Sequence, residues 1–274
     1  MQTHPRKHTL MAMILAMGLG AFSLAQASDF YVQSKWVETD GTPYESCGEY
    51  CPSVDYQLIH TGHMWLDSVI NKDVLAIIDV LDEHDPNSAI AKQTKTFYDK
   101  PLVTDRELAR ELNRITNNLV GAVNTARAED SIYSYSVMAT PSMIGMHKGL
   151  ALMRIDGNVY TGGAHDLPSS YYYVFDLTNK KLLTLDDIII AGQQDALEQM
   201  LYAKFYEYLI AMEVEPSEIM NSWDFAVTDN FMFDETGVEF LYQPYEITPY
   251  VFGMPSLHLS YAELKGILKS QYLK

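Results

Sequence analysis

The sequence places two glycines at the end of a strand-like run, Val159-Tyr160-Thr161-Gly162-Gly163-Ala164-His165. Paired glycines permit the left-handed backbone conformations that a tight turn or bulge requires. A second strand-like run, Tyr173-Val174-Phe175-Asp176-Leu177, follows soon after. We therefore expect two strands joined by a turn, with Gly162 and Gly163 as structural turn residues that fix the direction of the next side chains.

The rest of the C-terminal half shows the same pattern of strands and turns. Period-two patterns predict strands at 132–137, 149–155, 170–177, 230–234, 238–242 and 256–259. Asp156-Gly157-Asn158 is typical of a turn to a further strand. A long helix is expected over 195–213, offset or ended by Pro216. Ser260-Tyr261-Ala262-Glu263 has the pattern that caps a final helix.

The N-terminal half is richer in helices. Strands are expected at 30–37 and 54–60, and apolar residues at helical spacing predict a helix over 65–81. A second helix begins at the capping box Thr104-Asp105-Arg106-Glu107. Hairpins with helices packed on them predict an α+β fold of antiparallel sheet layers.

The N-terminus has the features of a targeting segment. Arg6 and Lys7 precede an apolar stretch over 10–24, and Ala25-Gln26-Ala27 offers the small residues of a cleavage site. We expect a signal peptide at 1–27 that is cleaved after Ala27, which predicts a periplasmic or secreted protein. Retention as an uncleaved anchor is the alternative. No later stretch offers 18 consecutive apolar residues, so no transmembrane segment is expected in the mature chain.

The charge balance limits the choice of partners. The chain has 36 acidic and 19 basic residues, and removal of residues 1–27 leaves 17 basic residues and a net charge of −19. Nucleic-acid binding is disfavoured, because it needs a positive face that displaces phosphate counterions. A basic partner is compatible with this charge. The alternative is that the acidity serves only solubility.

The two cysteines, Cys47 and Cys51, lie close together in the sequence. In an oxidising compartment a disulfide is the default, and so short a loop pins a local turn more than it stabilises the fold. A redox-active pair normally has two intervening residues, whereas this pair has three. A zinc site with His60 and His63 is the remaining alternative, which the export compartment disfavours.

Two groups of histidines invite a chemical interpretation. His165 with Asp166, or with Asp176 across a hairpin, would form an acid–base pair. A half-buried histidine that donates one ring N–H to a carbonyl and holds the turn explains the pattern better. His60 and His63 lack a third metal ligand. No nucleophile elbow and no carboxylate pair typical of glycoside hydrolysis is present. We therefore predict no catalytic residues, no metal and no cofactor.

A second turn-rich run, Gln243-Pro244-Tyr245-Glu246-Ile247-Thr248-Pro249-Tyr250, combines rigid turns with tyrosines. Rigid aromatic loops make good binding anchors because little entropy is lost on contact. The alternative is a loop that packs its tyrosines under the sheet edge. The candidate binding residues from both runs are Tyr160, Thr161, His165, Tyr245, Glu246, Pro249 and Tyr250.

Several runs, taken in order, resemble a known family of exported bacterial domains. They include Tyr160-Thr161-Gly162-Gly163-Ala164-His165, Leu183-Thr184-Leu185-Asp186-Asp187, Pro244-Tyr245-Glu246-Ile247 and Ser260-Tyr261-Ala262-Glu263-Leu264. Residues 138–274 resemble the DUF3298 domain of the RsiV-like, lysozyme-sensing anti-sigma factors. Residues 28–137 resemble, more weakly, the DUF4163 region that commonly precedes it. No sigma-factor-binding segment is expected before the apolar stretch.

The resemblance implies an exported binding or sensor-type protein without catalytic activity. Its implied ligand is lysozyme, another basic envelope protein or an envelope glycan. One alternative is a hydrolase that acts on peptidoglycan fragments through His165 and a nearby carboxylate. Another is an assembly factor of the envelope with no small ligand.

Overall fold

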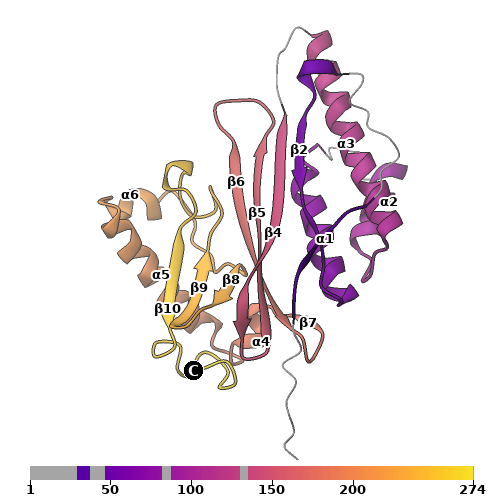
Figure 1. Cartoon of the computed structure of the whole chain (residues 1–274). Helices are drawn as coiled ribbons and strands as arrows, with labels where there is room; N and C mark the ends of the chain where they lie inside the picture. Colours follow the sequence, from indigo (N-terminus) through magenta and orange to yellow (C-terminus); the bar gives the residue numbers. More distant parts are fainter. Residues whose placement is uncertain (1–29, 38–46, 82–87, 130–134, 274) are drawn as a thin grey trace, which may run out of the picture. The chain divides into compact units, whose positions relative to one another are not determined.

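Three long, consecutive strands form the centre of the computed structural model, which describes residues 30–37, 47–81, 88–129 and 135–273 (Figure 1). They pair antiparallel in chain order, and a short strand extends the sheet at each edge. The first of the short strands runs parallel to its neighbour and the second antiparallel. The order is β2 (Ser53–Tyr56), β4 (Ser136–His147), β5 (Leu150–Tyr160), β6 (Leu167–Asp176) and β7 (Lys181–Leu182).

Two smaller antiparallel sheets accompany the central one. One pairs β1 (Gln33–Lys35) with β3 (Leu58–His60). The other has the order β10 (Ser256–Ser260), β9 (Gly237–Leu241), β8 (Phe231–Phe233). The helices are α1 (Met64–Ile78), α2 (Ala89–Tyr98), α3 (Asp105–Ala128), α4 (Leu185–Ile188), α5 (Gln194–Ala211) and α6 (Pro216–Met220), with short 3-10 turns at Gly48–Tyr50 and Tyr250–Phe252. Tyr31–Lys274 form one compact unit.

Helix α1 packs on one face of the central sheet (Figure 1). The Trp65 ring meets the Phe175 ring edge-on at 5.5 Å between centroids. Tyr173, two residues earlier on the same face of β6, is buried and hydrogen-bonds Asp73 of α1. Side chains of a strand alternate between faces, so Tyr172 points to the opposite face of the sheet.

The opposite face of the sheet joins a second apolar core. Leu150, Leu152 and Val174 contribute to it from the central sheet, and Tyr172 packs at its margin. The buried stripe of α5 and the strands β8 to β10 supply the rest, including Leu197, Leu201, Phe205, Leu209, Phe231, Phe233 and Phe240. β5 is therefore buried on both faces near its start. The predicted α+β fold with helices packed on antiparallel sheets is confirmed.

The sequence signals for the starts of helices are confirmed. Thr104 and Glu107 form the reciprocal capping box that the sequence predicts for α3. Thr184 and Asp187 form a second one at α4. Pro216 lies at the first position of α6, where proline costs no hydrogen bond, so it begins a short helix after the end of α5.

Three local expectations are wrong. Asp156-Gly157-Asn158 is no turn, because β5 continues through it and Gly157 pairs with Ala139 and Ser169. The glycine instead permits close packing, since an added Cβ would lie 2.5 Å from Ser169 Oγ and 2.6 Å from Ile77 Cγ2. Glu263 does bond Ser260, but turns and an isolated bridge at Leu268 follow in place of a helix. The strand expected at 54–60 divides at Gln57 between two sheets.

The expected signal peptide at 1–27 and the first half of the strand expected at 132–137 fall outside the described residues. β4 begins at Ser136 and continues ten residues beyond the expected end, to His147. Among the helices that the structure describes, none combines the length and hydropathy needed to cross a bilayer.

Candidate functional site

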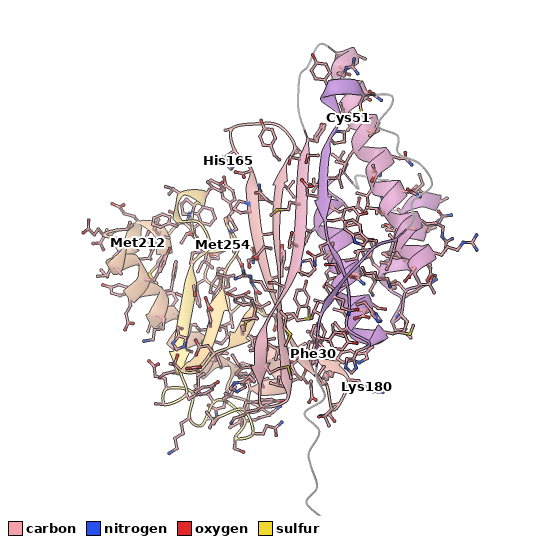
Figure 2. All side chains as sticks on the ribbon, in the orientation of Figure 1. Phe30, Cys51, His165, Lys180, Met212 and Met254 are labelled. Carbon is pink, nitrogen blue, oxygen red and sulfur yellow. A yellow bond between two sulfur atoms is a disulfide. The ribbon has the colours of Figure 1, made fainter. Side chains whose placement is uncertain are left out.

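The paired glycines form the tip of the β5–β6 hairpin, at the end of these strands where Figure 2 labels His165. Gly162 and Gly163 have φ values of 95° and 111°, the left-handed region that favours glycine. The Tyr160 hydroxyl donates to the Gly163 carbonyl at 3.2 Å. The Asn158 amide donates to the Asp166 carboxylate at 2.7 Å across the hairpin. The tip is thus a closed, hydrogen-bonded loop with His165 exposed on it.

The second turn-rich run follows β9 and is fixed by its own contacts. The Gln243 amide N–H donates to the Glu246 carboxylate at 2.7 Å, which closes a turn around Pro244 and Tyr245. Ile247 and Thr248 are buried and anchor the loop to the core. Pro249 leads into the 3-10 turn that begins at Tyr250. Only part of this loop is packed, and its tyrosine rings lie at the surface.

Two side-chain amides join this loop region to the free edge of β6. Gln243 exchanges two hydrogen bonds with the backbone of Ser170, Nε2 to the carbonyl at 2.7 Å and Oε1 from the amide at 3.1 Å. Asn230 accepts from the Tyr172 amide at 2.7 Å and donates to the Ser170 and Leu241 carbonyls at 2.9 Å. The two side-chain amides bond the backbone groups of β6 that a neighbouring strand would bond. They therefore hold the start of the loop against the hairpin.

The two loops meet in a cluster of rings that we call the hairpin-tip cluster: His165, Trp223, Tyr245 and Tyr250. The His165 imidazole stacks on the Tyr250 ring with 3.8 Å between centroids. The Tyr245 ring is tilted against the Tyr250 ring, with 5.6 Å between centroids, and stacks on the Trp223 ring at 6.4 Å. The Tyr250 hydroxyl donates to the Asp166 carbonyl at 3.0 Å. The cluster therefore joins residues from three separate segments.

Tyr245 has an unusual backbone within this cluster. Its φ is 68°, a conformation that is an outlier for a bulky residue. Its side chain is 47% exposed, so burial of the ring does not explain the strain. Strain of this kind is concentrated at functional sites, where the surrounding structure holds a side chain in a required position.

Both ring nitrogens of His165 have partners. Nδ1 lies 2.8 Å from the Asp166 carbonyl, which only accepts, so Nδ1 carries the proton. Nε2 is then the acceptor for the Tyr245 hydroxyl at 3.3 Å. No carboxylate bonds this imidazole in the described part of the chain. The Asp166 carboxylate pairs with Asn158, and Asp176 accepts from Thr178 and Asn179 at the far end of β6.

The acid–base pair that the sequence suggested is therefore not assembled. His165 bonds a backbone carbonyl, as the favoured alternative expects, but the residue is exposed and not half-buried. Of the candidate binding residues, His165, Tyr245 and Tyr250 come together directly. Tyr160, Glu246 and Pro249 shape the two loops instead.

A surface pocket of about 490 Å³ lies beside the hairpin. Thr161, Leu167 and Tyr171 line it from the hairpin, Gln243 and Pro244 from the second loop, and Ile77 and Val80 from the end of α1. The Tyr171 hydroxyl is protonated and able to donate at neutral pH, as an ordinary tyrosine is, and burial together with the nearby Glu246 carboxylate raises its pKa further. The loop pair thus offers a ring cluster and an adjoining hollow.

Sequence reasoning missed Trp223, Asn230 and the bridging role of Gln243. Trp223 lies in a segment without regular secondary structure, where Trp223, Phe225 and Val227 alternate with more exposed residues. That alternation was the available signal. The pairing of Gln243 with Ser170 leaves no local pattern, because the partners are 73 residues apart.

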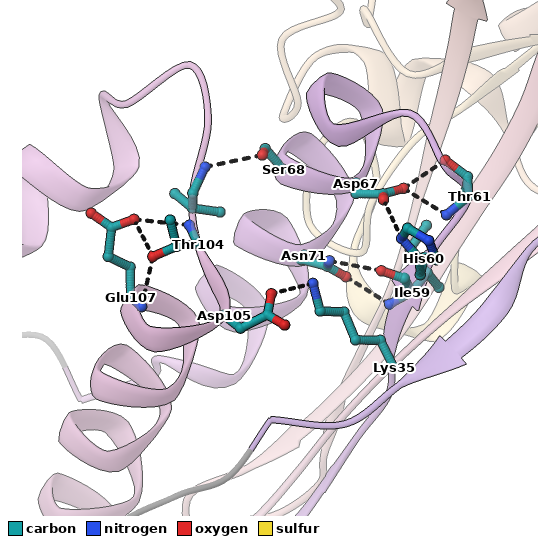
Figure 3. A network of polar contacts seen from close by, with 11 residues as sticks. Lys35, Ile59, His60, Thr61, Asp67, Ser68, Asn71, Thr104, Asp105 and Glu107 are labelled. Carbon is teal, nitrogen blue, oxygen red and sulfur yellow. Dashed lines mark hydrogen bonds and ion pairs between the residues drawn. The ribbon is translucent and has the colours of Figure 1, made fainter.

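The other histidine pair has a structural role at the entry to α1 (Figure 3). The buried Asp67 carboxylate accepts from the Thr61 amide at 2.9 Å and the Thr61 hydroxyl at 2.6 Å, and it lies 3.1 Å from His60 Nδ1. Asn71 exchanges two hydrogen bonds with the backbone of Ile59. His63 is the N-cap residue of α1. Within the described ranges no group of three metal-ligating side chains converges.

The predicted disulfide between Cys47 and Cys51 is confirmed, with 4.9 Å between the Cα atoms. Cys47 is buried against Val120 and Val123 of α3. Arg127 lies over the Tyr50 ring at 5.0 Å and donates to the Cys47 carbonyl. The bridge therefore pins a turn onto the last part of α3, far along the chain from the hairpin-tip cluster.

Comparison with known proteins supports the family resemblance for part of the chain. Residues 186–262 match the family model described as Protein of unknown function (DUF3298). The match begins within α4 and ends just past β10, so it includes the Gln243–Tyr250 loop and not the β5–β6 hairpin. Among curated proteins, none has a matching sequence.

Two solved structures share the fold. One is a DUF3298 family protein from Pseudomonas aeruginosa PAO1, 20% identical, with a TM-score of 0.61 over 89% of this chain and 96% of that chain. The other is a member of the DUF3298 family from Bacteroides fragilis NCTC 9343, 21% identical, with a TM-score of 0.64 over 89% of this chain and 95% of that chain. The RsiV-like character and the DUF4163-like region stay predictions.

Proposed function

We propose that this chain is an exported, non-catalytic binding protein that contacts its ligand through the hairpin-tip cluster. Export is supported by the targeting features of residues 1–27 and by a disulfide, which persists in oxidising compartments. In this proposal residues 28–137 are the DUF4163-like region and residues 138–274 the RsiV-like domain. The match over 186–262 lies within the second of these.

The observation that carries the proposal is the exposed ring of Tyr245, which a strained backbone holds between Trp223 and Tyr250. Rigid aromatic rings with polar tips give a large contact area at low entropic cost. Hydrogen bonds from two segments hold the rings in place before any ligand arrives, and such preorganisation favours affinity. A surface built in this way suits recognition better than core packing.

The proposed ligand is an envelope protein or glycan, and lysozyme is the candidate that the RsiV-like resemblance names. The acidic chain favours a basic protein, because opposite charge speeds association and orients the partners. Catalysis is not part of the proposal. Both His165 nitrogens are engaged, and Asp166, Asp176 and Glu246 all bond other groups.

Calorimetric titration with a c-type lysozyme, at about 50 and about 150 mM salt, tests the proposal. Binding is expected to weaken about tenfold or more in Tyr245→Ala and in Tyr250→Ala, as for central aromatic contacts. The matched control is Tyr31→Ala, which removes an exposed tyrosine that precedes β1.

One result would contradict the proposed ligand, and another would contradict the proposed contact surface. Failure of the folded protein to bind at both salt concentrations would remove lysozyme as the ligand, and envelope glycan fragments would be tested next on the same variants. Equal binding by wild type, Tyr245→Ala and Tyr250→Ala would remove the hairpin-tip cluster as the contact surface.

A further inference from the structure

Helix α5 carries two apolar stripes, one buried and one exposed, which lie about 100° apart around the helix axis. Its buried stripe, Leu197, Leu201, Phe205 and Leu209, faces the core. Its outer side carries Tyr202, Tyr206 and Ile210, which are 45%, 50% and 53% exposed. These residues are four apart, so they form one continuous stripe along the helix. A surface helix normally shows polar residues there, so this outer stripe calls for a partner.

The outer stripe continues into a hollow at the N-terminal end of α5. The Tyr202 ring meets the Phe225 ring edge-on at 5.5 Å. Phe225, together with Leu185, Ile189 and Val227, forms the apolar lining of a pocket of about 480 Å³. Stripe and pocket together make a single groove, which we call the α5 groove.

Carboxylates border the α5 groove and no basic residue lines its pocket. Asp186, Glu198 and Asp229 belong to the pocket wall. Between residues 182 and 264 the sequence has 15 acidic residues and one basic residue, Lys204. Lys204 is already paired with Glu207 at 3.3 Å and Glu263 at 3.1 Å. The groove is therefore apolar along its length and negative at its borders.

We infer that the α5 groove docks a basic, amphipathic segment of a partner polypeptide. The stripe from Tyr202 to Ile210 extends over about 12 Å at the rise of an α-helix, a length that suits two or more turns of a helical segment. Apolar side chains of that segment cover the stripe, and its lysine or arginine residues meet Glu198, Asp186 and Asp229. The inference does not depend on the hairpin-tip cluster.

Charge argues against a second copy of this chain as the occupant. A twofold contact on the stripe would bring the carboxylates of one α5 against those of the other. Like charges held close together oppose association. A partner with basic residues on either side of an apolar stripe meets no such penalty.

The test uses three synthetic peptides of about 18 residues. The first has leucines on one helical face and lysines on the other, the second replaces every lysine by glutamate, and the third keeps the lysines but scrambles the apolar pattern. Fluorescence anisotropy measures their binding to the full chain and to two variants, Tyr206→Ser with Ile210→Ser, and Glu198→Gln with Asp229→Asn. The matched control variant is Ile144→Ser with Met146→Ser, which replaces two exposed apolar residues of β4 outside both proposed surfaces.

The first peptide is expected to bind the wild type and the Ile144→Ser, Met146→Ser variant equally. Its binding should weaken about tenfold or more in the Tyr206→Ser, Ile210→Ser variant and measurably in the carboxylate variant. The substituted side chains are exposed, and thermal unfolding monitors whether each variant is folded. Undiminished binding to the Tyr206→Ser, Ile210→Ser variant would overturn the inference, as would equally tight binding of the scrambled peptide.

Sedimentation velocity measures whether the wild type and the Tyr206→Ser, Ile210→Ser variant are monomers or dimers. A dimer that the Tyr206→Ser, Ile210→Ser substitutions dissociate would assign the groove to self-association and overturn the inference. The lysozyme experiment depends on variants of Tyr245 and Tyr250, whereas the peptide experiment depends on variants of α5 and its bordering carboxylates. Failure of lysozyme binding would therefore not change the peptide results, and failure of peptide binding would not change the lysozyme results.

Discussion

The side chain of Gln243 pairs with the backbone of Ser170 as a residue of a neighbouring strand would, with hydrogen bonds of 2.7 and 3.1 Å. β6 has no paired strand at this position on its outer edge, because β7 pairs only with Phe175 and Asp176. Exposed strand edges are normally covered or blocked. Here Gln243 closes the edge and at the same time fixes the loop that carries Tyr245.

Replacing Gln243 by alanine is expected to lower the free energy of unfolding by about 1–3 kcal/mol, since it leaves the amide of the buried Ser170 without its partner. The Ser170 carbonyl keeps its hydrogen bond from Asn230. Hydrogen exchange followed by NMR should show faster exchange of the Ser170 amide. The Tyr172 amide, which Asn230 holds, should stay protected.

The matched control is Gln199→Ala, which truncates an exposed glutamine on α5 and should leave stability within about 0.5 kcal/mol. Unchanged exchange at Ser170 in Gln243→Ala would show that solvent or another group replaces the side chain, and the edge-closing role would be lost.

Gly157 is expected to resist substitution. An alanine Cβ would lie 2.5 Å from Ser169 Oγ and 2.6 Å from Ile77 Cγ2, so α1 or β6 must move. We expect Gly157→Ala to lower the free energy of unfolding by about 1–3 kcal/mol, as overpacked sites do. Urea denaturation measures the effect.

Gly121→Ala provides the control, because nothing lies within 4 Å of its added Cβ on the exposed side of α3. Helix propensity predicts that this substitution raises stability by up to about 1 kcal/mol. If the two glycine variants behaved alike, close packing of α1 on β5 would not explain Gly157.

Helices with caps and regular apolar spacing could be predicted from the sequence because those signals are local. The capping box of Thr104 and Glu107 and the buried stripe of α5 are examples. α2 has only Thr94 and Phe97 buried, so its sequence lacks a clear apolar stripe. Gly157 has no side chain because α1 packs closely against β5 at this point. The residues next to Gly157 in the sequence give no sign of this contact, so the sequence pattern wrongly predicts a turn there.

The candidate site could be predicted only in pieces. Each loop carries its own turn signal, Gly162-Gly163 in one and Pro244 with Pro249 in the other. Their meeting depends on the bonds of Gln243 and Asn230 to β6, which connect residues 58 to 73 positions apart. Trp223 enters the cluster from a third segment, so no spacing rule would have joined it to His165.

The buried pair of Asp73 and Tyr173 predicts a pH dependence of stability. Burial raises the pKa of Asp73, and the weaker effects of the Tyr173 hydrogen bond and of Lys72 only oppose this. The protonated carboxyl is therefore favoured in the folded state. Its favourable contribution is complete below the unfolded pKa of about 3.9 and is lost as pH rises through the higher folded pKa.

Asp73→Asn removes this ionisation. At neutral pH the variant is expected to be as stable as wild type or more stable, and its advantage should shrink as pH falls toward 4. Urea denaturation between pH 4 and pH 8 measures the difference, with exposed Asp224→Asn as the control whose difference stays constant. A variant that loses stability most at pH 8 would show that the ionised Asp73 is favoured in the fold.

The disulfide is expected to stabilise the chain modestly and locally. A loop as short as Cys47–Cys51 is worth about 2 kcal/mol by the loop-entropy relation, and its contacts are with the last part of α3. Cys47→Ala with Cys51→Ala should lower the free energy of unfolding by about that amount, and unfolding should stay cooperative. Reduced wild type should match the variant in urea denaturation. Ligand binding at Tyr245 and Tyr250 should be unchanged in the variant, whereas loss of cooperative unfolding would mean that the bridge holds the whole fold together.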